Sequence, residues 1–164
     1  MDTRRNTPEG ELRLKSFHYM NSILGKRELS RYPWAAGAEG LFLDDCGFVS
    51  EGTVNNIFFV QEGVIHTPAL ETCILPGITR DWVIRTALTA GIPVEEGFYP
   101  WEALLEADEI FLTGSIQELT PVTRLYDTDG QSHSVGNASA GDITRRLSAL
   151  YALAVRQEGG EPHE

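Results

Sequence analysis

The chain has 164 residues, 41% of them apolar, and its 24 acidic and 13 basic side chains give a formal charge of −11. That length supports one domain built around one core. An acidic surface repels nucleic acid and anionic membranes, so we expect neither as a partner, and an anionic small ligand would need a local pocket of backbone amides.

The first part of the chain is predicted to run from an irregular arm into a helix. Residues 1–11 are polar and contain Pro8 and Gly10, which is typical of a connecting arm. A helix is expected over residues 16–29, with Ser16 as its N-cap. The apolar stripe expected on this helix consists of Phe17, Met20, Ile23 and Leu24.

Short β-rich runs follow the first helix. Residues 40–43 and 56–60 are dominated by apolar side chains that favour strands. Turn-forming residues at 44–47 and 61–63 come directly after these two runs. The pattern therefore predicts antiparallel hairpins in this part of the chain.

The second half of the sequence alternates between helical and extended patterns. Its first helix opens at the motif Leu75–Arg80 and ends near Gly91, with Ile78, Trp82, Val83, Ile84 and Leu88 as the expected apolar stripe. The elements expected after it are a strand over 92–95, a helix over 101–106, a strand over 109–113, a loop over 114–117, extended chain over 119–126 and a helix over 142–156.

These elements predict a mixed α/β (α+β) domain, with hairpins early and helix–strand alternation later. We expect the domain to cover residues 12–157. The Gly-Gly-Glu-Pro composition of residues 158–164 predicts a disordered tail.

The cysteines and the N-terminus indicate a cytoplasmic protein. Cys46 and Cys73 have neither CxxC spacing nor paired histidines nearby, so we expect two reduced thiols and no metal site. No apolar run approaches the roughly 18 residues of a membrane span. Met1–Arg5 is not followed by the apolar segment of an export signal.

Lys15 is the first candidate functional residue. The chain has only two lysines, Lys15 and Lys26, against eleven arginines. Lys15 stands where an extended pattern gives way to a helical one. Unlike an arginine guanidinium, a lysine amine can lose its proton and attack a carbonyl carbon to form a Schiff base.

Glu51 and the start of the helix at Gly77 each allow two interpretations. Glu51 interrupts a β-rich region, so it is either an exposed turn residue or a carboxylate that meets a partner. Gly77, Ile78 and Thr79 place amide donors and a hydroxyl at a helix N-terminus, which suits a phosphate. An ordinary helix start beside Pro76 would have the same sequence.

Four segments together resemble a known family. They are Lys15–Glu28, Ser50–Gly52 with Asn56–Phe58, Leu75–Arg80, and Ala107–Ser115 with Glu118–Val122. In this order they resemble the successive signatures of the class IV, fold-type IV pyridoxal phosphate enzymes. The resemblance covers residues 10–155 and implies the large C-terminal cofactor domain of these enzymes. It also implies that the small N-terminal domain is absent from this chain, which leaves catalytic competence open.

The resemblance assigns roles by position. It implies that Lys15 forms the Schiff base with pyridoxal 5'-phosphate and acts as the base, and that Glu51 faces the pyridine nitrogen. It implies that the Ile78 and Thr79 amides, the Thr79 hydroxyl and Ser115 hold the phosphate. The further cofactor-binding residues that it implies are Tyr19, Asn56, Gly77 and Gly114, and the substrate-binding residues are Ser115 and Ile116.

Among family members, the runs Lys15–Asn21 and Gly114–Leu119 most resemble bacterial 4-amino-4-deoxychorismate lyases. This resemblance implies release of pyruvate to leave 4-aminobenzoate for folate biosynthesis, on a small-molecule amino substrate, in a homodimer. One alternative is a class IV aminotransferase of D-amino or branched-chain amino acids. Another is a noncatalytic domain that binds pyridoxal phosphate or serves assembly.

Overall fold

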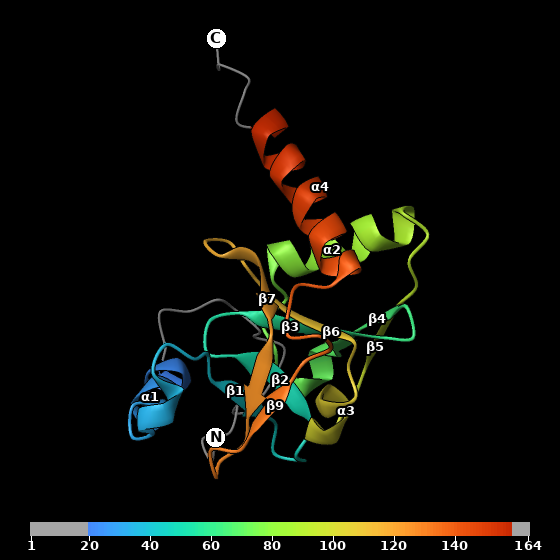
Figure 1. Ribbon diagram of the computed structural model, residues 1–164. Helices are drawn as coiled ribbons and strands as arrows, with labels where there is room; N and C mark the ends of the chain where they lie inside the picture. The colour runs from blue at the N-terminus through green and yellow to red at the C-terminus, as the bar shows by residue number, and fades with distance from the viewer. Residues whose placement is uncertain (1–19, 159–164) are drawn as a thin grey trace.

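A computed structural model describes residues 20–158, in which one five-stranded sheet is accompanied by two two-stranded sheets (Figure 1). The strands are β1 (Leu41–Leu43), β2 (Val49–Gly52), β3 (Asn56–Gln61), β4 (Val64–Pro68), β5 (Val94–Gly97), β6 (Glu109–Gly114), β7 (Glu118–Val122), β8 (Arg124–Tyr126) and β9 (Ser132–Ser134). The helices are α1 (Met20–Leu29), α2 (Ile78–Thr89), α3 (Trp101–Leu105) and α4 (Asp142–Glu158), with 3₁₀ turns η1 (Pro33–Ala35) and η2 (Leu70–Thr72).

The five-stranded sheet has the order β5-β4-β3-β6-β7, with β3 at its centre. β3 pairs antiparallel with both β4 and β6, and the Phe58 and Phe111 rings of one such pair stack with centroids 5.1 Å apart. β4 and β5 are parallel because the connection between them crosses over through α2. The predicted hairpin at residues 61–63 is confirmed.

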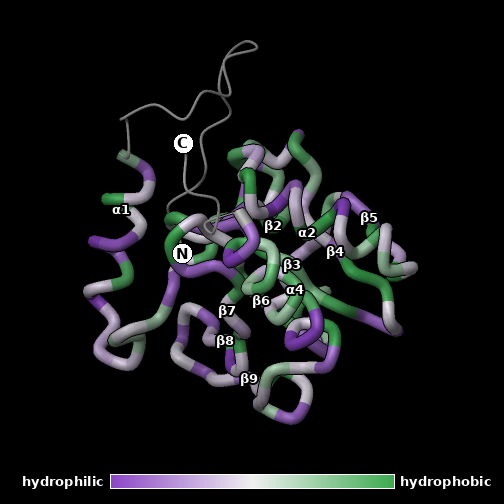
Figure 2. The backbone as a smooth tube through the Cα atoms, turned by 90° about the horizontal axis from the view of Figure 1, so that it is seen from above, coloured by the Kyte–Doolittle hydropathy of each residue, from purple (hydrophilic) through white to green (hydrophobic). Residues whose placement is uncertain are grey.

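Successive side chains of β3 enter two different cores, because residues of a strand alternate between the faces of a sheet. Phe58 and Val60 pack with Val83 of α2 and Leu147 of α4. The other face carries the remaining core cluster, whose members include Ile57, Phe59, Leu104, Leu112 and Leu125. The helices α2 and α4 therefore cover one face, while α3 and the two small sheets lie against the other (Figure 1). Figure 2 shows hydrophobic residues, in green, along these central strands.

The predicted apolar stripes of the first two helices are wrong in part. Met20 and Ile23 of α1 are 60% and 59% exposed, and the buried residues of this helix are Ser22 and Gly25. In α2, Ile78 and Leu88 are exposed. Val83 is buried as expected, in a line with Thr79 and Ala87, which are spaced four residues apart and so share one face.

The second half of the chain contains a strand that the sequence pattern did not predict. The extended run expected over 119–126 is broken into β7 and β8, and β8 pairs with β9. Ser132–Ser134 is too polar to show an apolar alternation, so nothing in its composition marks a strand. Asp127 shapes the connecting turn by accepting hydrogen bonds from the amides of Asp129 and Gln131.

The Cys46 side chain is exposed, and that of Cys73 is half-buried. Across residues 20–158, no helix combines the length and the apolar content needed to cross a bilayer. The same part of the chain holds no group of three or more His, Cys, Asp or Glu side chains that could bind a metal ion.

Candidate active site

Three connecting segments meet around the first residues of β3. Gly77, just before α2, lies so close to Asn56 that a Cβ atom on it would stand 2.3 Å from Asn56 Oδ1. Gly114, at the end of β6, would place a Cβ atom 2.6 Å from Asn55 Oδ1. Such contacts are shorter than those that real Cβ atoms make, so a side chain at either position would push the asparagine side chain aside. The β2–β3 turn, the approach to α2 and the β6–β7 turn are thereby held together.

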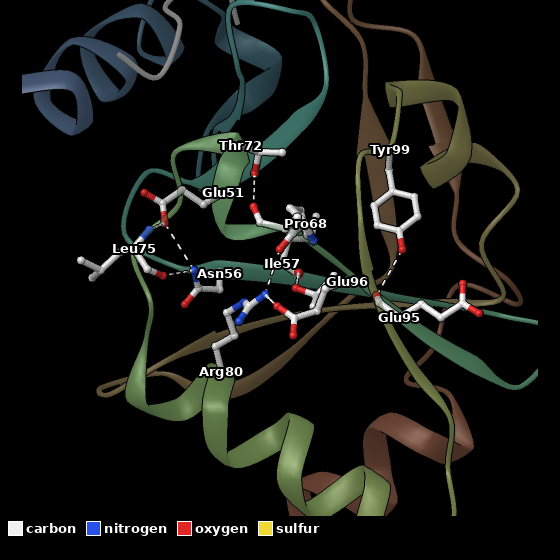
Figure 3. Close-up of polar contacts among 12 residues, drawn as sticks. Glu51, Asn56, Ile57, Pro68, Thr72, Leu75, Arg80, Glu95, Glu96 and Tyr99 are labelled. Atoms are coloured by element: carbon white, nitrogen blue, oxygen red, sulfur yellow. Dashed lines mark hydrogen bonds and ion pairs between the residues drawn. The ribbon is translucent and has the colours of Figure 1, made fainter. Parts of the chain in front are cut away.

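Glu51 lies at the centre of this arrangement, on β2. Its side chain is buried, with 6% exposed. Its Oε2 atom accepts a hydrogen bond from the Leu75 amide at 2.8 Å and another from Asn56 Nδ2 at 3.3 Å. Asn56 Nδ2 also donates to the Leu75 carbonyl oxygen at 2.9 Å, and Figure 3 shows the three groups turned toward one another. The interpretation of Glu51 as an exposed turn residue is therefore wrong.

The segment that supplies Leu75 is fixed from its other end as well. Ser50 is fully buried, and its hydroxyl donates to the Thr72 carbonyl oxygen at 2.7 Å. The Thr72 hydroxyl donates in turn to the Ala69 carbonyl oxygen at 2.8 Å. Neighbouring residues of β2, Ser50 and Glu51, thus hold two points of the same segment. The Glu51 carboxylate is oriented before any ligand arrives.

The first turn of α2 is suited to an anion. Gly77 is the N-cap and has no side chain to accept a hydrogen bond from the first helical amides. The opening amides of a helix have no partners within the helix, and the helix dipole adds positive potential there. The Thr79 side chain is buried toward the protein, whereas Ile78 is exposed. The expected phosphate site at Gly77–Thr79 therefore has the donors that a phosphate requires.

The β6–β7 turn forms the third side of the site. Ser115 is exposed, and the Ile116 side chain is 95% exposed at the tip of the turn. Beside them, Thr113 Oγ1 and Asn55 Nδ2 are buried polar atoms with no hydrogen-bond partner among the described residues. Buried polar groups in native proteins are nearly always satisfied, so two orphans beside one turn point to a functional role for it.

Two of the expected site residues, Lys15 and Tyr19, lie outside residues 20–158. The remaining ones cluster: Glu51 and Asn56 bond to each other, Gly77 contacts Asn56, Ile78 and Thr79 follow Gly77, and Ser115 and Ile116 follow Gly114. Asn56 was expected to contact the cofactor. Its Nδ2 atom serves Glu51 and Leu75 instead, so a cofactor contact stays a prediction.

Two residues of this region carried no role in the sequence analysis. The Asn55 side chain packs against the backbone of Gly114, and Arg80 is a buried cation in the first turn of α2. Arg80 could have been noticed, because the positive end of a helix dipole disfavours a cation and such a residue needs a reason. Asn55 gave no signal, since asparagine is ordinary in the turn before a strand.

Comparison with known proteins identifies relatives for this arrangement. Residues 1–125 match the family model described as amino-transferase class IV. The chain is 40% identical to the aminodeoxychorismate lyase of Bacillus subtilis (strain 168) over 156 residues, which are 95% of this chain and 50% of that protein.

Solved structures of aminotransferases also resemble this chain. The branched-chain amino acid aminotransferase of Escherichia coli superposes with a TM-score of 0.81 at 35% identity, over 93% of this chain and 49% of that one. The branched-chain aminotransferase of the thermophilic archaeon Thermoproteus uzoniensis, crystallised with norvaline, superposes with a TM-score of 0.82 at 33% identity, over 98% and 51%. The chain thus spans about half the length of the relatives it matches.

The contact between Gly77 and Asn56 generates a prediction about stability. In Gly77→Ala the added methyl group would force the Asn56 side chain away from Glu51, which we expect to lower the free energy of unfolding by about 1–3 kcal/mol. Urea unfolding of the variant measures this loss. Arg85→Ala, an exposed change on the same helix, should alter stability by less than about 0.5 kcal/mol.

A double mutant separates this collision from a general effect on the helix. Asn56→Ala removes the oxygen that the new methyl group would meet. The free-energy losses of Gly77→Ala and Asn56→Ala should therefore sum to more than the loss in the double mutant. Losses that simply add would show that the two residues do not oppose each other.

Proposed function

We propose, from the premise that this chain belongs to the class IV aminotransferase family, that it is the cofactor-binding part of a pyridoxal phosphate-dependent 4-amino-4-deoxychorismate lyase. The observation that carries this proposal is the convergence of the buried Glu51 carboxylate, the first turn of α2 and the β6–β7 turn on the start of β3. The three groups match two parts of one cofactor: the carboxylate would face the ring nitrogen, and the two turns would hold the phosphate.

The residues fit pyridoxal phosphate. The close approaches of Gly77 and Gly114 to asparagine side chains leave backbone, without a side chain, at the places where the phosphate would be held. Two buried polar atoms without partners among the described residues, Asn55 Nδ2 and Thr113 Oγ1, lie beside the same turn. When bound, the cofactor supplies a pyridine ring that stabilises the negative charge left after a proton is removed from the carbon next to the substrate amine.

The Glu51 carboxylate would accept a hydrogen bond from the protonated pyridine nitrogen. Its Oε2 atom receives two N–H donors, and such charge-assisted bonds stabilise a carboxylate and fix its direction. A negative carboxylate in a buried site keeps its ring partner positively charged, because the pair costs less than either charge alone. The electron-withdrawing power of the ring depends on that charge.

The phosphate would be bound by the Ile78 and Thr79 amides, the Thr79 hydroxyl and the Ser115 hydroxyl. Lys15 would anchor the cofactor covalently and, once its amine is released by the substrate, move the proton at the substrate carbon. Ser115 and Ile116, which are exposed on the β6–β7 turn, would contact the substrate.

The similarity to the Bacillus subtilis lyase, which extends over nearly the whole chain, favours lyase activity and with it a place in folate biosynthesis. The similarity to branched-chain aminotransferases supports transamination of amino acids as a second candidate. Both activities use the same cofactor, and both would act on a small amino substrate. We extend the proposal to a homodimer, which the resemblance to the family implies, located in the cytoplasm.

Cofactor attachment is tested by reduction with borohydride after incubation with pyridoxal phosphate. We expect the mass of one reduced cofactor on the peptide that contains Lys15, and none after Lys15→Ala. Lys26→Ala is the matched control, because Lys26 is the chain's other lysine and is exposed on α1. Labelling that survives Lys15→Ala but not Lys26→Ala would refute the assignment.

The reaction itself is tested with two substrate sets. The proposal predicts that 4-amino-4-deoxychorismate yields 4-aminobenzoate and pyruvate in equal amounts, and that Glu51→Gln lowers this rate by at least about 100-fold through loss of the ring-nitrogen charge. Turnover of D-alanine or a branched-chain amino acid that requires a keto acid, without release of 4-aminobenzoate, would establish the aminotransferase instead.

A further inference from the structure

Arg80 is a buried cation with no assigned role, two residues into α2. Its side chain is 6% exposed. Its Nη2 atom donates to the Pro68 carbonyl oxygen at 2.9 Å and to Glu96 Oε2 at 2.5 Å. Figure 3 shows the side chain rising from the start of α2 toward both acceptors. Arg80 therefore ties the first turn of the helix to the sheet.

The two acceptors lie at the same end of neighbouring strands. Pro68 is the last residue of β4, and Glu96 lies near the end of β5. The strands are parallel, with Thr67 opposite Glu96 and Pro68 opposite Gly97. The Arg80 Nη2 atom thus bonds to the ends of both β4 and β5 and fastens α2, the helix that connects them, to the sheet.

Stability alone does not account for an arginine at this position. The N-terminal end of a helix dipole disfavours a cation. A buried ion pair often contributes no more to stability than well-packed apolar side chains of similar volume. In addition, Arg80 Nε is buried and has no partner among the described residues, which adds a desolvation cost. All three unfavourable contributions to stability arise at Arg80, which follows directly after the candidate phosphate-binding residues.

The location of Arg80 supplies the missing reason. Gly77 rests against Asn56 on one side of the first turn, and Arg80 is anchored to β4 and β5 on the other. Ile78 and Thr79 are the two residues between these anchors. The directions of their amides are therefore fixed at both ends, and preorganised donors bind an anion without the cost of ordering the loop.

We infer that Arg80, held by Glu96, is a positioning residue that sets the amides of Ile78 and Thr79 for the phosphate of the cofactor. The inference rests on the proposed function, since it concerns the same site. It assigns Arg80 no contact with the phosphate. Its effect should be specific to a phosphorylated ligand, because the proposed site assigns only the phosphate to the turn that Arg80 fixes.

A second arginine on the same helix provides a matched control. Arg85 bonds to Asp81 at 2.7 Å, but both side chains are exposed, at 70% and 64%. An exposed pair of this kind contributes little to stability and fixes no turn. Arg85→Met removes the same charge from α2 as Arg80→Met does, but the contact that it breaks is an exposed one within the helix rather than a buried one to the sheet.

The test compares pyridoxal phosphate with pyridoxal, which lacks the phosphate. Dissociation constants for both are measured with the full chain, from the visible absorbance of the lysine-bound cofactor. We expect Arg80→Met to weaken pyridoxal phosphate binding about tenfold, roughly the loss of one hydrogen bond to an anion. Pyridoxal binding should change by less than about twofold, which is within 0.5 kcal/mol. Arg85→Met should change neither.

Glu96→Gln keeps the inference testable if Arg80→Met does not fold. It retains an oxygen acceptor and removes the charge, so we expect the same selective loss at about threefold. Equal weakening of both ligands, or no weakening of either, would overturn the inference. A wild-type chain that binds neither ligand would instead overturn the proposed cofactor, and the inference with it.

Discussion

The amide of Asn56 is the contact on which the candidate site depends. A single nitrogen donates to Glu51 of β2 and to the Leu75 carbonyl oxygen of the segment before α2, and Asn56 itself begins β3. Three elements that are distant in sequence are thereby joined at one buried point. Without that amide the Glu51 carboxylate would lose one of its donors, and a poorly satisfied buried charge is costly. The same residue also disfavours a side chain at position 77, because a Cβ atom there would meet the Asn56 Oδ1 atom.

The sheet explains why this point exists. β3 is buried on both faces by two cores, so packing from both sides holds its first residues in place. The turns that close over this end carry the chemistry: a carboxylate, a helix N-terminus and a hydroxyl-bearing turn. Rigid strands with functional turns at their ends are a common way to combine precise placement with chemical variety. Arg80 extends the same logic by fastening the first turn of α2 to the far strands.

Much of this could be predicted from the sequence, for identifiable reasons. The apolar run of β3 and the Gly77–Thr79 helix start are local patterns, and the order of four motifs indicated the family that the comparisons confirm. Contacts between residues distant in the sequence leave no local pattern. The burial of Glu51, the two hydrogen bonds of Asn56 Nδ2 and the bonds of Arg80 to β4 and β5 depend on how the strands pair. β9 was missed because its residues are polar. The assignments of Lys15 and Tyr19 stay predictions, since both lie outside the described residues.

Asn56 and Leu75, which both donate to Glu51, would hold its carboxylate so that it keeps a pyridine nitrogen protonated. The most direct measurement is the 15N chemical shift of pyridoxal phosphate labelled at the ring nitrogen and bound to the chain. We predict a protonated nitrogen in the wild type, an unprotonated one in Glu51→Gln, and a mixture of both in Asn56→Ala. A shift that is the same in wild type and Glu51→Gln would contradict the claim.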